Sequence, residues 1–497
     1  MNTKSRSVPP KASAMLEALR GLGYSPGGAL ADLIDNGIAA EATQVAIFFS
    51  WKGPLSTIAV LDNGSGMDEQ ELERAMRLGE RSPLDARSAH DLGRFGLGLK
   101  TASFSQCRRL TLASRKAGTT HSFRWDLDAL AASTDGGWHL FEGPDPESEA
   151  ALDLLQPDQS GTLVLWEILD RMVAAGSTEQ DFLDLIDRVE AHLSMVYHRF
   201  LSGPIPRLRL TINGKLVSPW DPFAVNHPAT WTSPVERFRT DSGLVSAQSH
   251  VLPHKDRLSD QEYNSIAGPD GWTAQQGFYV YRNERLLVAG NWLGLGQGRP
   301  WTKEEAYRLT RISLDIPNSA DADWKIDIRK SIARPPASLR MRLTRFAEDA
   351  RERARRVFAH RGQPMSAPGS PPVIQAWRVE RFHGGIRYRL DLKHPSIASV
   401  LDDAGTLTPQ IKAMLRVVEE TIPVQRIWLD TAEAKETPRI GFAGAELSEV
   451  ASVLNVMYRN LVSRKGLSAA AARDRLSRTD PFHHYPDLVA SLPDNLT

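Results

Sequence analysis

The stretch Asp91-Leu-Gly-Arg-Phe-Gly-Leu-Gly-Leu-Lys100-Thr-Ala-Ser103 decides the fold of this chain. Gly93, Gly96 and Gly98 are spaced as G-x-x-G-x-G, and the lysine and hydroxyl residues that follow can open a helix. Glycine lets a backbone approach a ligand closely, and the free N–H groups at a helix start attract phosphate. The order is not the Rossmann G-x-G-x-x-G, and Leu99 separates the last glycine from the lysine, unlike a Walker loop. The stretch predicts a phosphate-binding turn of another kind.

A predicted helix upstream carries a polar pair. Ser25-Pro26 is a typical helix start, with a capping hydroxyl followed by proline at the first helical position. Apolar residues then recur at helical spacing, namely Leu30, Leu33, Ile34, Gly37 and Ile38. Asp32 and Asn36 lie off this stripe and are four residues apart, so their side chains share one face. A solvated face is the ordinary interpretation of such a pair, and the neighbouring segments favour a functional one.

Two strands are predicted at 45–49 and 58–61, and the second runs into Asp62-Asn-Gly64-Ser-Gly66-Met67. Asp68 and Glu71 are spaced as a capping box for a following helix. Asp-Asn-Gly is a strong turn signal, so a tight turn is one interpretation. In a binding site, the same aspartate would accept a hydrogen bond from an exocyclic amine, and the glycines would admit a flat base.

A fourth segment, Gly161-Thr162-Leu-Val-Leu-Trp166, opens an apolar strand. With these segments in this order, the chain resembles the GHKL ATPases, which include DNA gyrase, the mismatch-repair protein MutL, the large ATP-dependent heat-shock chaperone and the sensor histidine kinases. Ala31-Asp-Leu-Ile-Asp-Asn36 and Gly93-Arg-Phe-Gly-Leu-Gly-Leu-Lys-Thr-Ala102 look most like the MORC ATPases and their bacterial relatives. Four ordered segments are more specific than any one motif.

The resemblance implies an α+β fold with a Bergerat-type α/β sandwich for ATP over residues 1–200. A ribosomal-protein-like transducer domain would follow over 201–360, with strands within 206–214, 277–287 and 312–316. The Pro/Gly/Ser-rich segment 361–372 predicts a linker, and 373–497 predicts a small C-terminal α+β domain of unknown role. The stretch 143–161 is expected to be a loop, and 242–276 an insertion whose His250 and His254 are ordinary loop histidines.

Site roles follow from the resemblance by position. Asn36 matches the magnesium ligand, Asp62 matches the residue that holds the adenine amine, and Thr162 lies near adenine. Gly64, Gly66 and Met67 would line the base pocket. The backbone that contacts phosphate would comprise Gly96, Leu97, Gly98, Leu99 and Lys100. The region 77–98 resembles the lid that closes over ATP.

The general base in the family is usually a glutamate four residues before the metal asparagine, and Asp32 occupies that position here. Its side chain is one methylene shorter, so slow turnover is expected. Asp35 is the other carboxylate candidate. Lys330 is expected to reach the terminal phosphate from the transducer domain, with Lys325 as the alternative.

Composition limits the partners. The 497 residues balance 60 Lys+Arg against 60 Asp+Glu, so a nucleic-acid partner would need a local patch. Such a patch is offered by a predicted basic helix with arginines at 340, 342, 345, 351, 353, 355, 356 and 361. The single cysteine, Cys107, is expected to be structural, and it suits a reducing cytoplasm. No apolar run reaches membrane-spanning length.

The sequence therefore predicts a cytoplasmic MORC-like GHKL ATPase that converts ATP and water to ADP and phosphate with Mg²⁺. By resemblance it would form an ATP-dependent homodimer, bind duplex DNA and act in restriction-type antiviral defence beside a companion nuclease or methyltransferase. Two alternatives remain: an ATP-sensing scaffold with little hydrolysis, and a chaperone-like ATPase acting on protein clients. A sensor kinase is disfavoured because no phospho-acceptor histidine precedes the first predicted helix.

Overall fold

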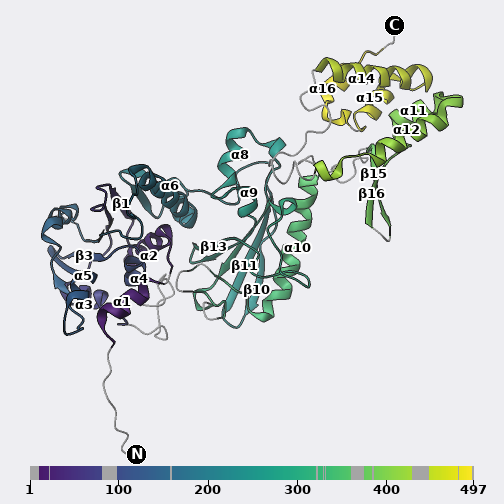
Figure 1. The fold of residues 1–497 in the computed structure, drawn as a ribbon. Helices are drawn as coiled ribbons and strands as arrows, with labels where there is room; N and C mark the ends of the chain where they lie inside the picture. Colours follow the sequence, from purple (N-terminus) through teal and green to yellow (C-terminus); the bar gives the residue numbers. More distant parts are fainter. Residues whose placement is uncertain are drawn as a thin grey trace, which may run out of the picture. The chain divides into compact units, whose positions relative to one another are not determined.

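The computed structural model describes residues 10–21, 23–80, 98–156, 159–320, 323–327, 330, 332–359, 374–382, 385–427, 447–479 and 481–494. The chain divides into two compact units, Met1–Gln363 and Pro364–Thr497. The first unit contains two sheets, and each sheet is covered on one face by helices (Figure 1).

The first sheet has eight strands in the order β5-β4-β3-β6-β2-β1-β7-β8. Their bounds are β1 (Gln44–Ser50), β2 (Thr57–Asp62), β3 (Arg109–Lys116), β4 (Thr119–Asp126), β5 (Phe141–Glu142), β6 (Gly161–Glu167), β7 (Arg209–Ile212) and β8 (Lys215–Leu216). All neighbours are antiparallel except β1 and β7, which are parallel. The sheet therefore extends beyond residue 200, where the sequence predicts the end of the first domain, because the late strand β7 pairs with the early strand β1.

Helices cover one face of this sheet. They are α1 (Ala12–Arg20), α2 (Pro26–Ala39), α3 (Glu69–Met76), α4 (Gly98–Phe104) and α6 (Glu179–Val196), with the shorter α5 (Leu127–Ala132) and α7 (His198–Leu201). Leu30 of α2, Phe104 of α4 and Val189 of α6 share one core with Ile47 and Val60 of the sheet. Burying such side chains contributes about 1.5–3 kcal/mol each. The predicted α+β class is confirmed, with a large mixed sheet under a helical layer.

Local sequence signals place the elements of this layer. The Ser25 hydroxyl caps α2 by accepting from the Gly28 N–H at 3.2 Å. Asp68 and Glu71 form the predicted capping box at the start of α3. On the opposite face, the stretch 143–161 holds the 3-10 helix η1 (Pro146–Leu154), whose leucines pack on Ala59, Ala113 and Leu165. That stretch is therefore partly helical, contrary to the expected loop.

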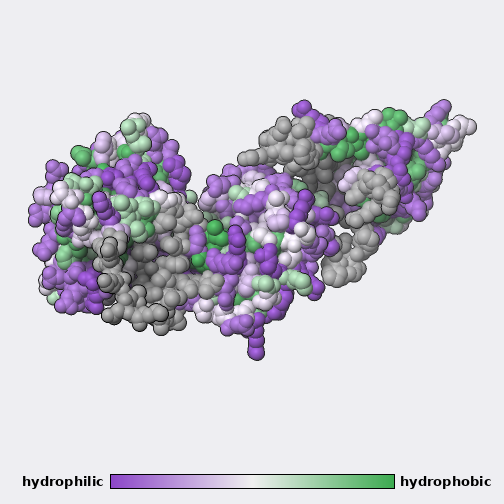
Figure 2. Space-filling model, turned by 60° about the horizontal axis from the view of Figure 1, so that its bottom comes forward, coloured by the Kyte–Doolittle hydropathy of each residue, from purple (hydrophilic) through white to green (hydrophobic). Residues whose placement is uncertain are grey.

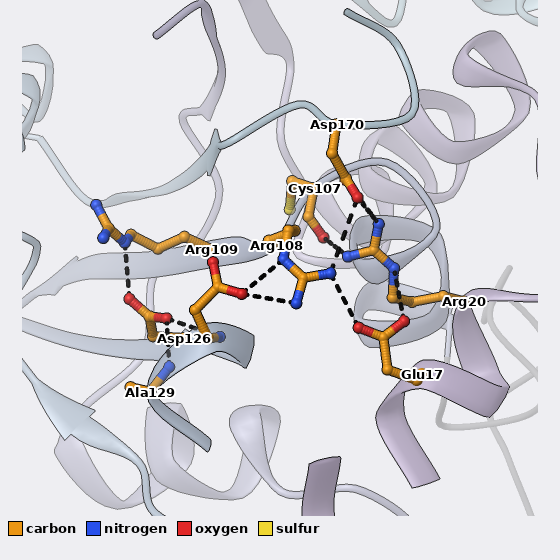
Figure 3. A network of polar contacts seen from close by, with 9 residues as sticks. Glu17, Arg20, Cys107, Arg108, Arg109, Asp126, Ala129 and Asp170 are labelled. Atoms are coloured by element: carbon orange, nitrogen blue, oxygen red, sulfur yellow. Dashed lines mark hydrogen bonds and ion pairs between the residues drawn. The ribbon is translucent and has the colours of Figure 1, made fainter. Parts of the chain in front are cut away.

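A polar network fixes α1 to the start of β3 (Figure 3). Arg20, buried at the end of α1, donates to both carboxylate oxygens of Asp170 at 2.6 Å and to the Cys107 carbonyl at 3.3 Å. Arg108 donates to Glu17 and Asp128 at 2.9 and 2.8 Å. The Cys107 thiol is fully buried, and burial raises its pKa well above the usual range. These contacts fit the structural role expected for this cysteine.

The second sheet of this unit has the strand order β10-β11-β14-β12-β13, with β9 paired to β11. The bounds are β9 (Trp231–Thr232), β10 (Glu236–Thr240), β11 (Gly243–Val251), β12 (Gly277–Arg282), β13 (Arg285–Asn291) and β14 (Thr310–Ile316). The long helix α10 (Ala337–Ala359) covers one face, with α8 (Asp260–Ala267), α9 (Gly271–Ala274) and the 3-10 turns η2 (Lys255–Arg257), η3 (Glu305–Tyr307) and η4 (Asn318–Ala320) around the sheet (Figure 1). The predicted strands within 206–214, 277–287 and 312–316 are present as β7, β12–β13 and β14.

The stretch 242–276 is not an insertion, because it supplies β11, an inner strand of the second sheet. His250 lies on that strand and is buried, with its Nδ1 atom 3.1 Å from the Thr232 hydroxyl. Only His254 lies between elements, where it caps η2. The alternation of small and polar residues along β11 hides its strand character from a search for apolar runs.

The second unit contains the hairpin β15 (Trp377–Phe382) and β16 (Gly385–Leu390) and a set of helices. The helices are α11 (Pro395–Asp403), η5 (Gly405–Leu407), α12 (Thr408–Glu420), α14 (Leu447–Arg459), η6 (Asn460–Arg464), α15 (Ala469–Leu476), η7 (Phe482–His484) and α16 (Pro486–Ala490). The predicted linker 361–372 lies outside the described residues. In the described part of the chain, no helix has the length and hydrophobicity of a membrane span. The face drawn in Figure 2 is mostly hydrophilic.

Candidate active site

Asp62 lies at the end of β2, where two neighbouring strands present polar groups. Its Oδ1 accepts from the Gly64 N–H at 2.8 Å, and it is paired across the sheet with Thr162 of β6. Burial raises the pKa of the Asp62 carboxyl to about 6, although hydrogen bonds from the Gly64 and Thr162 backbone oppose the shift. A carboxyl with such a pKa is a poorly solvated acceptor at the edge of a sheet.

Ser114 of β3 connects the residues around this carboxyl, and sequence reasoning missed it. Its hydroxyl accepts from the Met67 N–H at 2.9 Å and donates to the Gly161 carbonyl at 3.0 Å. The Thr162 hydroxyl lies 3.0 Å from it. Nothing in the sequence around Ser114 resembles a site motif, but its register opposite Thr162 in the β3–β6 pairing brings the two hydroxyls together.

Two glycines are required here by close backbone approach. Gly66 has φ +68°, and a Cβ atom there would lie 2.0 Å from the Arg115 carbonyl oxygen. A Cβ atom on Gly161 would lie 2.3 Å from the Asp62 carbonyl oxygen. Side chains at these positions are excluded, so the segment after β2 can lie directly against β3 and β6.

The other carboxylates lie on α2. Asp32 and Asp35 are buried, with 5% and 2% exposed surface. The Lys330 ammonium, which comes from the segment before α10, donates to Asp32 Oδ1 at 2.9 Å and to Asp35 Oδ2 at 2.5 Å. Lys330 has a left-handed φ of 54°, a conformation that a non-glycine residue adopts only when its surroundings hold it there. The predicted base and the predicted lysine are therefore in direct contact across almost 300 residues of sequence.

Lys325, the alternative lysine, is exposed and makes none of these contacts. Its side chain has no hydrogen bond or ion pair to any residue that the structure describes. The geometry therefore favours Lys330 of the two.

Three further residues complete the α2 cluster, and no sequence motif pointed to them. The Tyr24 hydroxyl donates to Asp32 Oδ2 at 2.9 Å. The Tyr197 hydroxyl donates to Asp35 Oδ1 at 2.7 Å. Arg285 of β13 donates through Nε to Asp35 at 3.1 Å. Burial works to raise the pKa of Asp35, but Arg285 and Lys330 outweigh it and hold this pKa at about 2.

Asn36 follows the two aspartates at the surface of α2. Its side chain is exposed, and among the described residues it has no hydrogen-bond partner. A free carboxamide oxygen beside two carboxylates is a suitable ligand for a hard cation such as Mg²⁺. Among the described residues, no group of three His, Cys, Asp or Glu side chains could hold a metal by itself. Phosphate oxygens and water would have to complete the coordination.

The last glycine of the predicted phosphate-binding segment, Gly98, lies where α4 begins. A Cβ atom at Gly98 would lie 3.6 Å from Asp32 Oδ2. The Lys100 ammonium donates to the Ala75 and Arg77 carbonyls at 2.8 Å and so caps the C-terminal end of α3. Burial lowers the pKa of Lys100 to about 8.

Gly93, Gly96 and Leu97 lie outside the described residues, as do residues 81–97 of the predicted lid 77–98. Leu99 is half-buried against the core of the helical layer. Two cavities of about 370 and 360 Å³ lie elsewhere, against the start of α10, and are lined by none of the predicted site residues.

Comparison with known proteins supports the same region. Residues 24–162 match the family model described as histidine kinase-, DNA gyrase B- and HSP90-like ATPase. The chain is 31% identical over 136 residues to the chaperone protein HtpG of Nitrosospira multiformis, covering 23% of this chain and 21% of HtpG. It is 34% identical over 95 residues to the ATPase MORC2B of Mus musculus, covering 18% of this chain and 9% of MORC2B. It is 27% identical over 158 residues to the DNA mismatch repair protein MutL of Afipia carboxidovorans, covering 30% of this chain and 26% of MutL. The matched part of the chain thus spans between 9% and 26% of the length of these relatives.

The geometry fits the ligand that this family implies. A half-buried carboxyl beside two glycines suits the amine of adenine, and an exposed carboxamide suits a metal ion on phosphates. Residues 24–162 of this chain are therefore similar to the ATP-binding domain of the histidine kinase-, DNA gyrase B- and HSP90-like ATPases, and the similarity to MORC, MutL and HtpG proteins is consistent with a MORC-like GHKL ATPase.

Proposed function

We propose that this protein binds Mg·ATP between α2, the end of β2 and the start of α4, and slowly hydrolyses it to ADP and phosphate. The observation that carries the proposal is the buried contact of Lys330 with Asp32 at 2.9 Å. It joins the predicted base to a lysine from the segment between β14 and α10, in the same compact unit. A helix packed only for stability has no need of two buried carboxylates with two buried cations packed against them, because burying charge is costly.

Different residues of the proposed site bind the base, the metal ion and the phosphates. Asp62 accepts a hydrogen bond from the adenine amine, with Gly64, Gly66, Met67 and Thr162 around the base. Asn36 would hold Mg²⁺ through its carboxamide oxygen, and the ion supplies positive charge that offsets the phosphate oxygens. Of the backbone predicted to contact the phosphates, the described residues 98–100 form the start of α4, and their N–H groups would face the phosphates there.

The hydrolytic step is a transfer of the terminal phosphoryl group to water. The water oxygen bonds to phosphorus, the bond to the bridging oxygen of ADP breaks, and the water proton passes to Asp32. Lys330 exchanges Asp32 and Asp35 for the terminal phosphate oxygens and offsets their charge. The short side chain of Asp32 holds the water less closely than a glutamate would, so turnover is slow.

The test is steady-state ATP turnover by the full chain and by Asp32→Asn. The variant should lose at least about 30-fold in kcat while binding Mg·ATP with similar affinity, because a base acts in the transition state. Asp187→Asn, the same change on the exposed face of α6, is the matched control. Equal turnover by wild type and Asp32→Asn would remove Asp32 from the mechanism.

We further propose that ATP binding drives homodimerisation and that the dimer acts on duplex DNA, in bacteria beside a companion nuclease or methyltransferase in antiviral defence. The name of the MutL relative concerns DNA mismatch repair. On α10, Arg345 is exposed and has no acidic partner among the described residues, which leaves it free for a phosphate.

Other arginines of α10 have structural contacts. Arg342 lies 4.7 Å from the Phe238 ring centre and Arg353 lies 4.0 Å from that of Trp231. The buried Arg351 lies 3.7 Å from that of Tyr307. Sizing with a non-hydrolysable ATP analogue tests the dimer, and DNA-stimulated turnover that weakens with salt tests the DNA contact.

Two rival functions have support of their own. The HtpG relative favours a chaperone, and suppression of client aggregation without any response to DNA would favour that function. The engagement of both Asp32 oxygens, by Lys330 and Tyr24, favours an ATP-sensing scaffold. Nucleotide-driven dimerisation with no measurable turnover would favour the scaffold.

A further inference from the structure

We propose that a groove at the start of α10 binds the phosphodiester backbone of a nucleic-acid strand, with Arg334, Arg340 and Arg345 contacting its phosphates. The proposal rests on the proposed function, because it gives the DNA partner a defined site on this chain. It goes beyond that function by naming the site and by linking it to Lys330. None of the residues assigned to the nucleotide lines the groove.

The groove consists of two cavities of about 370 and 360 Å³, and Arg340 lines both of them. The first lies between α10 and the loop that follows β13. Its helical wall is formed by side chains at i, i+3, i+4 and i+7, namely Met341, Thr344, Arg345 and Glu348. The second lies between the end of β13 and the segment 332–334. Each has the volume of a small-ligand site, so the pair can hold successive units of a polymer.

Positive charge without an acidic partner gathers on this groove. Arg340 and Arg345 line it and pair with no acidic side chain among the described residues, and the same holds for Arg334. Arg340 donates to a carbonyl of the loop after β13 at 2.9 Å. Glu348, the acidic residue in the lining, accepts a hydrogen bond from the same loop. The groove therefore attracts an anion.

The described arginines of α10 outside the groove have other partners. Arg342, Arg351 and Arg353 lie over aromatic rings, and Arg355 and Arg356 pair with Glu352. The charge available on this helix is thus concentrated where the cavities are.

Backbone N–H groups of the loop add further donors. The N–H groups of Gly294, Gly296 and Gln297 have no hydrogen-bond partner in the described part of the chain, and all three residues line the groove. A Cβ atom at Gly296 would lie 2.0 Å from the Arg299 carbonyl oxygen, so the loop must stay bare there. Free N–H groups beside guanidinium groups are donors that bind phosphate oxygens.

The geometry favours a strand backbone over an acidic peptide. An α-helix rises about 1.5 Å per residue, so Arg340 and Arg345 lie about 7.5 Å apart along the axis of α10, which leaves room for one phosphate at each. Guanidinium forks match pairs of phosphate oxygens. Between the charges the groove is lined by Leu295 and Met341, and Met341 is 81% exposed. These apolar side chains would contact the uncharged sugars.

The segment that forms one wall of the groove also carries Lys330. Ile332 and Arg334 line the second cavity, and the Lys330 ammonium binds the carboxylates of α2. The Arg334 N–H donates to the carbonyl of the buried Trp324 at 2.7 Å, which closes the segment into a loop around Lys330. A phosphate on Arg334 therefore bears on the chain close to Lys330, so DNA in the groove should stimulate ATP turnover.

The first experiment measures binding of a fluorescent duplex DNA to the full chain by anisotropy, without nucleotide and at several salt concentrations. Each phosphate contact contributes about 0.9 to the slope of log affinity against log salt, or about tenfold in affinity at about 0.1 M salt. Arg340→Gln should therefore lose about tenfold, and Arg340→Gln/Arg345→Gln should also lower the slope by about two. Arg355→Gln is the matched control and should keep its affinity, because Arg355 is exposed on the same helix and pairs with Glu352.

The second experiment locates the DNA. The single cysteine of the chain, Cys107, is fully buried, so Met341→Cys adds one accessible thiol at the groove. Duplex DNA with a disulfide tether on its backbone should cross-link to this thiol at least about tenfold faster than to that of Leu55→Cys, because binding raises the local concentration of the tether. Leu55 is 70% exposed between β1 and β2, far along the sequence from the groove.

The third experiment tests the link to Lys330. The DNA concentration that gives half-maximal stimulation of ATP turnover should rise about tenfold in Arg334→Gln, with basal turnover unchanged. DNA that binds in the groove without any effect on turnover would overturn this link.

Three results would overturn the groove as a strand site: equal loss of affinity in Arg355→Gln, an unchanged salt slope in the double variant, or equal cross-linking at Leu55→Cys. Displacement of the DNA by poly-glutamate at equal charge concentration would overturn it too, in favour of an acidic peptide. The binding and cross-linking experiments need no ATP turnover, so failure of the proposed hydrolysis leaves them valid. A wild type that binds no DNA would overturn the DNA part of the proposed function, and this inference with it.

Discussion

At the scale of single residues, the pKa of Asp62 makes nucleotide binding sensitive to acid. The pKa of this carboxyl in the folded protein is about 6, raised by burial from its ordinary value near 4. The proposed contact with the adenine amine requires the ionised form, so affinity should be constant above pH 7 and fall by up to about tenfold for each pH unit below 6. Isothermal titration with Mg·ADP between pH 5 and 8 measures this change.

Tripolyphosphate provides the control for that titration, because it shares the phosphate groups but lacks the base. Its affinity should follow only the phosphate titration, with no extra step near pH 6. Asp62 also affects the free energy of unfolding, with a sign opposite to that of a salt-bridged carboxylate. Because the folded protein binds the Asp62 proton more tightly than the unfolded chain does, stability should fall as pH rises from about 4 to 6. An identical pH dependence for the two ligands would contradict the placement of Asp62 under adenine.

The two candidate lysines should differ in their effect on ATP turnover. Lys330→Ala should lower kcat by about 100-fold with a smaller change in nucleotide affinity, because the ammonium offsets charge that develops during transfer. Lys325→Ala should stay within about twofold of wild type, since its side chain is exposed and makes no hydrogen bond or ion pair with Asp32 or Asp35. Single-turnover rates with both variants measure the difference. The reverse result would exchange the two assignments.

At the scale of elements, the turn after β2 depends on Gly66. Alanine there would place Cβ 2.0 Å from a backbone oxygen that cannot move without disturbing β3, in addition to the strain of φ +68°. Gly66→Ala should therefore cost about 1–2 kcal/mol for the backbone conformation and about 1–3 kcal/mol more for the overlap. Gly53→Ala isolates the first cost, because Gly53 has φ +57° with nothing within 4 Å of its Cβ position. Denaturant unfolding of both variants gives the difference, and equal losses would show that the overlap relaxes.

The elements around the site were predictable because local signals coincide with function there. Each of these elements is specified by residues close together in sequence: the Ser25 cap, the Asp68–Glu71 capping box and the apolar strands at 45–49 and 58–61. The partners Ser114, Tyr24 and Arg285 were not predictable, because each reaches the site through packing between segments far apart in sequence. Lys330 was found from the resemblance to a family, since nothing in its own segment points to a carboxylate on α2.

At the scale of the whole molecule, the first unit should act as one folding and catalytic body. The strand β7 pairs with β1 in the first sheet, and Lys330 and Arg285 bind carboxylates of α2. A chain ending at residue 363 keeps all of these contacts and should retain kcat and KM for Mg·ATP within about twofold. A chain ending at residue 200 leaves β1 unpaired along one edge and Asp32 and Asp35 without cations. Because buried carboxylates without partners are strongly destabilising, it should fail to fold or should melt at least about 10 °C lower. Circular dichroism melting of both fragments beside the full chain tests the claim, which would be wrong if the shorter fragment were as stable as the longer one.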